Sequence, residues 1–309
     1  MCPELIVHLA EGVLPLDQAI GWSVLAVPVV TWSIRGAQKE SAPPPITMAG
    51  VTSILFAATL LPLPVPALGA TSHICLTPIL ALLVGVRNVI WPTFFVLLLQ
   101  AIFFAHGGLT TLGINTLTLG VLGPLTAVGI WRLLQKFDVA NGLGLAFACG
   151  AGDLGVYVAD AAVLAFGLSD AVAPSTTFVT VLLGFAPVQI PLAVLEAFAS
   201  LGIVRVLATR RPDLLPESLR SIRKMPFSMS SLTMILLLAI APLGCSYQGI
   251  DGTVFGATAE KSGRPPTASL IDFSQGEVGL AMTIIILFGL GFAAGRGWER
   301  FFGRGRHAL

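Results

Sequence analysis

The fold of this chain is restricted most strongly by a series of apolar segments, each about as long as a membrane is thick. A helix needs roughly 20 apolar residues to cross the hydrocarbon core of a bilayer, and such windows recur along the sequence with short loops between them. Only 11% of the 309 residues are charged, whereas soluble domains carry about 25%. The sequence therefore predicts an all-α fold, a polytopic transmembrane helical bundle.

The apolar segments fall into two groups, which a basic and polar stretch separates. The first group predicts a bundle of about seven helices, in which the third segment is the shortest. The second group predicts a C-terminal transmembrane hairpin of two helices. The predicted crossings are 13–34, 46–68, 74–86, 89–105, 112–134, 142–166, 178–207, 232–246 and 278–294.

This grouping divides the chain into three parts. Residues 1–208 form the predicted bundle, and residues 209–228 form a basic linker on the cytoplasmic side. Residues 229–309 form the hairpin, whose two helices enclose an extracytoplasmic loop at 248–276.

The basic residues give the orientation, since Lys and Arg accumulate on the cytoplasmic side of membrane proteins. If the N-terminus lies outside and every segment crosses, only Lys261 and Arg264 among the basic residues fall outside. The same orientation places His8, His73 and His106 at outer ends of helices. We therefore expect a multi-pass protein of the bacterial or archaeal inner membrane, surrounded by lipid, with its N-terminus outside.

Two histidines near the starts of apolar segments are the first candidates for a site. His8 stands three residues before Glu11, and the pair predicts either a metal ligand at the outer mouth or an interfacial histidine beside a carboxylate that caps the first helix. His73 follows a proline-rich break, with Cys75 two residues further on. Non-helical backbone at membrane depth occurs where it lines a cavity, so His73 is either an imidazole in an outward pocket or a turn residue with one hydrogen bond.

Polar side chains interrupt the apolar helices that follow. Gln100, His106 and Asn115 lie in or beside them, and a pair of glycines after His106 permits a tight turn. These residues either form hydrogen bonds between helices or surround a metal and orient its ligands.

Three carboxylic acids are expected at membrane depth. Asp153 and Asp160 are seven residues apart on one face of a helix, and Glu196 lies in a later one. Ionisable residues inside a membrane are functional candidates. A proton or ion relay is one interpretation, and structural hydrogen bonding is the other.

Several function classes are excluded or disfavoured by the sequence. It has no Walker-type phosphate loop, so the chain is not expected to hydrolyse ATP, and no HExxH motif or triad order of a hydrolase is visible. The net charge of +1 disfavours nucleic-acid binding. Cys245 follows a small residue after an apolar run, which permits a lipidated cysteine, but the internal position favours an ordinary span.

Four segments, taken in order, resemble one known family. They are "HLAEGVLPLDQAIGW", "PVPALGATSH", "LLLQAIFFAHGGLTTLGINTLTLGVLGP" and "QIPLAVLEAFASLGIVRVL". Over residues 8–208 the chain resembles the CbiM/NikM family, the substrate-specific membrane components of energy-coupling factor ABC transporters for cobalt and nickel. The C-terminal hairpin resembles, in its topology, the small CbiN/NikN subunit of these systems.

The resemblance implies a transport component and no enzyme. It implies that the chain captures Ni(II) or Co(II) as transported substrate at the extracytoplasmic face, with His8 and His73 as metal ligands, and that it needs no organic cofactor. Uptake would be driven by separate partners, a CbiQ/NikQ-like coupling subunit and CbiO/NikO-like ATPase subunits. The alternative is a secondary transporter or channel that uses Asp153, Asp160 and Glu196, or a protein whose polar residues only pack helices.

One departure from the family pattern concerns the N-terminus. In the family the first histidine stands beside the free terminal amine, which also binds the metal, whereas residues 1–7 precede His8 here. Either these residues are removed, or the start is misassigned, or the site is altered or lost, with Cys2 or Glu11 recruited if altered.

Overall fold

The computed structural model describes most of the first two parts of the chain and a stretch of the third. The described residues are 8–39, 42–60, 63–65, 70–104, 106–139, 141–169, 172–220, 222, 248–249, 252–267 and 289. The two predicted helices of the hairpin, 232–246 and 278–294, lie outside these residues apart from Gly289.

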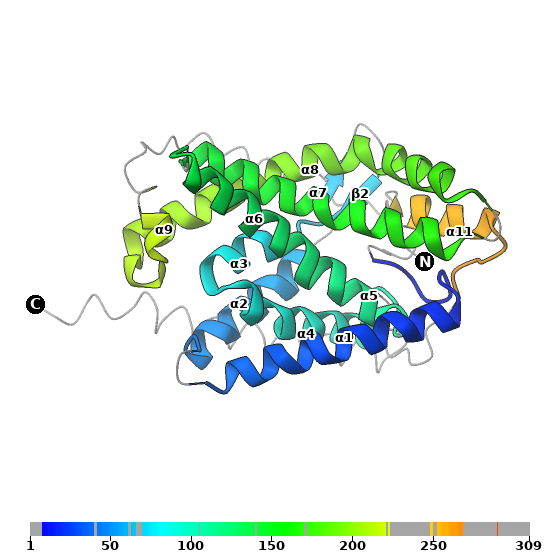
Figure 1. Cartoon of the computed structure of the whole chain (residues 1–309), viewed down its shortest axis with the longest axis horizontal. Helices are drawn as coiled ribbons and strands as arrows, with labels where there is room; N and C mark the ends of the chain where they lie inside the picture. The colour runs from blue at the N-terminus through cyan, green and yellow to red at the C-terminus, as the bar shows by residue number, and fades with distance from the viewer. Residues whose placement is uncertain are drawn as a thin grey trace, which may run out of the picture.

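Helices dominate the described part of the chain, as predicted. Figure 1 shows them running roughly along one direction, with α1 and α4 side by side and α7 against α8. A π-helical turn, Thr118–Leu122, joins α5 to α6. The helices are α1 (Leu16–Ala37), α2 (Pro45–Leu60), α3 (Thr77–Val84), α4 (Val86–Phe103), α5 (Leu112–Leu117), α6 (Gly123–Lys136), α7 (Gly142–Gly167), α8 (Pro174–Arg210), α9 (Glu217–Arg220) and α11 (Ala257–Lys261).

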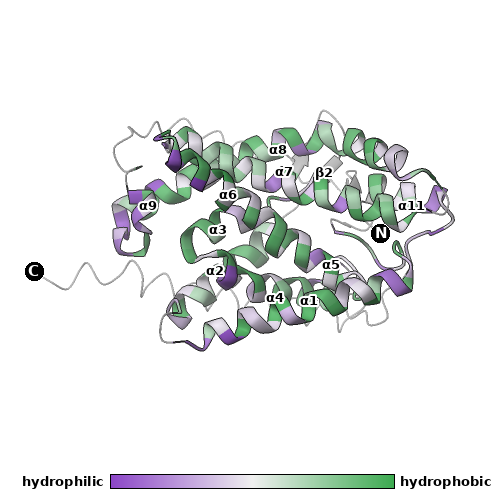
Figure 2. Ribbon diagram, in the orientation of Figure 1, coloured by the Kyte–Doolittle hydropathy of each residue, from purple (hydrophilic) through white to green (hydrophobic). Residues whose placement is uncertain are grey.

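Five of these stretches are long and apolar enough to cross a membrane: α1, α4, α5 with α6, α7 and α8. Large apolar side chains point outward from them, among them Val24 of α1 and Leu183 of α8, at 64% and 69% exposure. Figure 2 shows hydrophobic residues along most of their length, while the short α9 is mainly hydrophilic. Outward-facing apolar side chains on every long helix fit a lipid environment, so the chain is a multi-pass membrane protein.

The second predicted segment, 46–68, ends as a helix earlier than expected. Helix α2 stops at Leu60, and the chain then forms strand β1 (Leu63–Val65), which pairs antiparallel with β2 (Ala70–Ser72). The sequence "LPLPVP" explains the change, because proline lacks the N–H that continues a helix and favours extended backbone. His73 directly follows β2, the second strand of this β-hairpin.

The third segment passes along the bundle although its helix, α3, has only eight residues. At its start, the ring of His73 lies 5.0 Å from that of His8, which precedes α1. At its end, the Ser33 hydroxyl near the end of α1 donates a hydrogen bond to the carbonyl of Arg87. The chain therefore runs from one end of α1 to the other between residues 73 and 87, and α3, Thr77–Val84, is the helix contained in this run. Gly85, with φ 89°, makes the turn into α4.

Part of the predicted C-terminal loop packs back on the bundle. Strand β3 (Gln248–Gly249) pairs in parallel with β2, and the Thr267 N–H donates to the carbonyl of Glu11 at 2.9 Å. Phe255 is 2% exposed, with its ring 4.5 Å from that of Phe185 in α8. This stretch therefore lies at the same end of the bundle as His8.

Candidate metal centre

The segment ahead of α1 folds inward and is held by backbone contacts. Leu9 and Val13 are fully buried. The Leu9 carbonyl accepts hydrogen bonds from the Thr111 hydroxyl and from Asn115 Nδ2, the latter at 3.1 Å. These bonds fix the backbone next to His8 and give Asn115, a predicted pocket residue, a positioning role.

Three histidines from distant parts of the sequence meet at this end of the bundle. His8, His73 and His106 are 8%, 1% and 4% exposed. One ring nitrogen of each lies within 4.8 Å of the others. The ring centroids are 5.0 Å apart for His8 and His73, 5.0 Å for His8 and His106, and 6.0 Å for His73 and His106. Buried imidazoles this close form a ready set of nitrogen ligands.

The elements around the cluster explain why these rings converge. His73 follows β2, and its Nδ1 lies 3.2 Å from the carbonyl of Ile74, so this nitrogen can carry the proton and leave Nε2 for a metal. His106 follows the end of α4, where its N–H donates to the Gln100 carbonyl at 3.1 Å. Gly107, with φ 84°, then turns the chain.

Two further predicted pocket residues support the cluster without joining it. The Glu11 carboxylate accepts hydrogen bonds from the backbone N–H of Leu109, at 2.7 Å, and of Thr110. Glu11 thus fixes the turn after His106 and does not cap α1, whose N-cap is Pro15. Gln100 is fully buried in α4 and donates to the Thr59 hydroxyl at 2.8 Å.

Burial keeps the His8 imidazole neutral. Its pKa is well below 6.5, first because burial disfavours the charged ring and then because His106 and His73 would repel it, while a hydrogen bond with Gln100 acts in the opposite direction. A neutral imidazole offers a lone pair to a metal without first losing a proton.

A second group of potential ligands lies elsewhere in the core. Cys75, Asp153 and Glu196 are buried, with one ligand atom of each within 4.8 Å of the others. Asp160 is also buried but does not belong to this group. The sequence pairs Asp153 with Asp160 on α7, whereas the structure pairs Asp153 with residues from two other segments.

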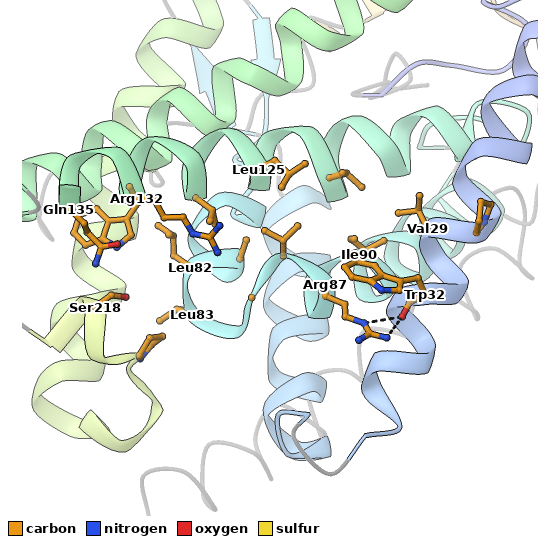
Figure 3. Close-up of a pocket in the computed structure, with 18 residues that line it drawn as sticks. Val29, Trp32, Leu82, Leu83, Arg87, Ile90, Leu125, Arg132, Gln135 and Ser218 are labelled. Carbon is orange, nitrogen blue, oxygen red and sulfur yellow. Dashed lines mark hydrogen bonds between the residues drawn. The ribbon is translucent and has the colours of Figure 1, made fainter. Parts of the chain in front are cut away.

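A pocket of about 860 Å³ opens away from the histidines. Figure 3 shows its walls, with Trp32 and Arg87 on one side and Arg132 and Ser218 on the other. The Arg87 guanidinium donates to the Trp32 carbonyl at 2.7 and 3.0 Å, which ties α1 to α4. None of the three histidines lines this pocket.

Comparison with known proteins gives a consistent result. Residues 8–214 match the family model described as CbiM, cobalt uptake substrate-specific transmembrane region. The chain is 32% identical to the cobalt transport protein CbiM of Geobacter sulfurreducens, over 96% of this chain and 90% of that protein. It is 36% identical to the cobalt transport protein CbiM of Sorangium cellulosum, over 71% of this chain and 98% of that protein.

Solved structures agree in fold. The crystal structure of a transition metal transporter aligns with a TM-score of 0.56 at 19% identity, over 71% of this chain and 98% of that one. A truncated transition metal transporter aligns with a TM-score of 0.55 at 20% identity, over 66% and 99%.

Proposed function

The chain belongs to the CbiM family of cobalt uptake membrane proteins, and we propose from this that it captures Co(II) or Ni(II) at the extracytoplasmic face. It is a component of a metal uptake transporter and no enzyme. In the proposal, separate coupling and ATPase subunits, resembling CbiQ/NikQ and CbiO/NikO, drive the import. The observation that supports it best is the convergence of His8, His73 and His106 in one buried cluster.

The proposed ligands are the imidazoles of His8 and His73, with His106 as a third. Imidazole nitrogen suits both cobalt and nickel. With His106 in the set, three nitrogen donors are available without the terminal amine, from which His8 is separated by residues 1–7. Those residues lie outside the described ones. Binding is then expected to survive replacement of residues 2–7 by glycine and serine at equal length, which keeps the terminal amine away from His8, and a loss of affinity on that replacement would show that this segment supplies a ligand.

Metal titration of the full-length protein in nanodiscs tests the site. His73→Ala is expected to weaken Co(II) and Ni(II) binding by at least about 10–100-fold, because it removes one of three ligands. His307→Ala is the matched control, since this fourth histidine stands in the C-terminal tail. Equal affinity in His73→Ala and the wild type would refute the site.

Uptake assays separate the ATP-driven proposal from the alternative of a secondary transporter. Metal uptake is expected to stop in cells that lack the ATPase subunits. Uptake that persists there and collapses with the proton gradient would instead indicate a relay through the buried carboxylates.

A further inference from the structure

Cys75, Asp153 and Glu196 form an enclosed group that the histidine cluster does not use. The three side chains come from the start of the third segment, from the middle of α7 and from α8, and each is at most 1% exposed. Their ligand atoms, one sulfur and two carboxylate oxygens, lie within 4.8 Å of one another. In the described part of the chain, no salt bridge joins Asp153 or Glu196 to a basic side chain.

Glu196 is held in place by the backbone ahead of α3. Its two carboxylate oxygens accept hydrogen bonds from the N–H groups of Cys75, at 2.7 Å, and Leu76, at 2.9 Å. Leu76 has φ 54°, a conformation that is strained for a non-glycine residue and is kept where the surroundings demand it. This turn aims both N–H groups at Glu196.

Asp153 contributes a buried carboxylate that could bind a metal ion. Both of its carboxylate oxygens are buried, and no N–H group of the described residues donates to either of them. Its interactions are with the Cys75 thiol and the Glu196 carboxyl group. Burying an ionised carboxylate is unfavourable, and buried acidic groups are normally paired with a cation or bound to a metal. The position therefore holds a buried carboxylate whose interactions are with the two other potential ligands and with no basic side chain of the described residues.

We propose that Cys75, Asp153 and Glu196 bind a divalent transition metal ion, at a second position deeper in the bundle than the histidines. The thiolate and the two carboxylates would more than balance the two charges of the ion, leaving a net charge of −1 if all three are deprotonated, and a sulfur and oxygen set accommodates Co(II) and similar ions. The sequence connects the positions directly, since Cys75 lies two residues after His73. The inference rests on the proposed function and extends it, because it adds a second binding site along the path of the transported metal.

Co(II) titration with optical detection tests the second position. The test protein is the full chain in nanodiscs with Cys2 and Cys245 replaced by serine, which leaves the two buried thiols, Cys75 and Cys149. Two equivalents of Co(II) are expected to bind, one of them with a sulfur-to-cobalt charge-transfer band in the near ultraviolet. Cys75→Ser is expected to abolish the band and one equivalent. Cys149→Ser, which changes a buried thiol outside the group, is expected to keep both.

A second variant covers the case in which Cys75→Ser does not fold. Asp153→Asn keeps the shape of the side chain and the thiol, and is expected to weaken the second equivalent by at least about tenfold. One equivalent without a charge-transfer band in the test protein would overturn the inference, as would a band that follows Cys149.

The two proposals fail in different ways. If His73→Ala removes one equivalent and no thiolate band is ever seen, the histidine site stands and only the second position is wrong. If His73→Ala changes nothing while Cys75→Ser removes the band, the deeper position stands and the histidine site is wrong.

Discussion

At the scale of single residues, the burial of His8, His73 and His106 in one cluster affects the protonation of His8. Burial and the two neighbouring imidazoles lower the pKa of His8 below 6.5. In the unfolded chain the same ring takes up a proton near pH 6.5. Protonation therefore favours the unfolded chain as the pH falls below 6.5, while the folded ring stays neutral.

The first prediction concerns pH. Lowering the pH from about 7.5 to about 6.5 is expected to leave the contribution of His8 to Co(II) binding intact, because protons compete with the metal for this ring only below its lowered pKa. Over the range below 6.5, the metal-free protein is expected to lose stability, because its unfolded state binds more protons. Isothermal titration and thermal melting measure the two effects. Protonation of the His8 ring above pH 6.5, monitored through its NMR signal in the metal-free protein, would contradict the lowered pKa.

The sequence predicted single site residues better than it predicted their contacts. His8 and His73 could be chosen because each stands at a helix start with unusual neighbours. His106 was placed only among the surrounding residues, since its approach to His8 depends on how α4 packs against the N-terminal segment. The pairing of Cys75 with Asp153 and Glu196 likewise depends on the turn at Leu76, for which the sequence carries no sign.

At the scale of elements, the N-terminal segment and the loop after α4 lie in direct contact. A Cβ atom at Gly108 would stand 2.6 Å from the backbone nitrogen of Glu11 and 2.8 Å from its Cα. Backbone cannot move aside as a side chain does, so only glycine fits here. The position of the segment that bears His8 thus depends on the absence of a side chain at Gly108.

The second prediction follows from this contact. Gly108→Ala is expected to displace the segment around Glu11, at a cost of about 1–3 kcal/mol in unfolding free energy, and to weaken Co(II) binding. Gly129→Ala is the control, because a Cβ at Gly129 on α6 meets nothing within 4 Å. Thermal melting and metal titration of both variants provide the comparison. The contact would be unimportant if the two variants behaved alike.

The elements themselves were largely predictable, because runs of apolar residues decide where helices form in a membrane. The helix ends were less so. The second segment reads as apolar up to residue 68, yet its prolines end the helix at Leu60. The third segment is mostly apolar, but its own helix is only Thr77–Val84, because the backbone ahead of it bonds to Glu196 instead of to a helical turn. Its last residue, Val86, already belongs to α4.

At the scale of the whole molecule, the C-terminal part of the chain contributes to the end of the bundle that holds the histidines. Phe255 lies in the core formed by Leu9, Val13 and Phe185. The sequence predicted a loop on this side but gave no sign that it packs against the bundle, since its residues are polar and rich in turn formers. Contacts between parts so far apart follow from the shape of the folded surface.

The third prediction tests this packing. Phe255→Ala is expected to cost about 3–5 kcal/mol of local stability, so trypsin should cleave after Lys261 faster than in the wild type. Glu260→Asp, an exposed change in the same short helix that keeps the negative charge beside Lys261, should leave the rate unchanged. Gel analysis of timed digests gives the rates. Equal cleavage of all three proteins would show that the loop is not anchored through Phe255.

The pairing of β2 with β3 has a consequence for assembly. Because both strands belong to one polypeptide, their association is intramolecular, with an effective concentration set by the connecting chain and independent of how much protein the cell makes. The covalent link also ensures that each bundle has one copy of β3, the strand that pairs with β2. A membrane component built this way cannot be left without that strand through unequal synthesis or by dilution in the bilayer.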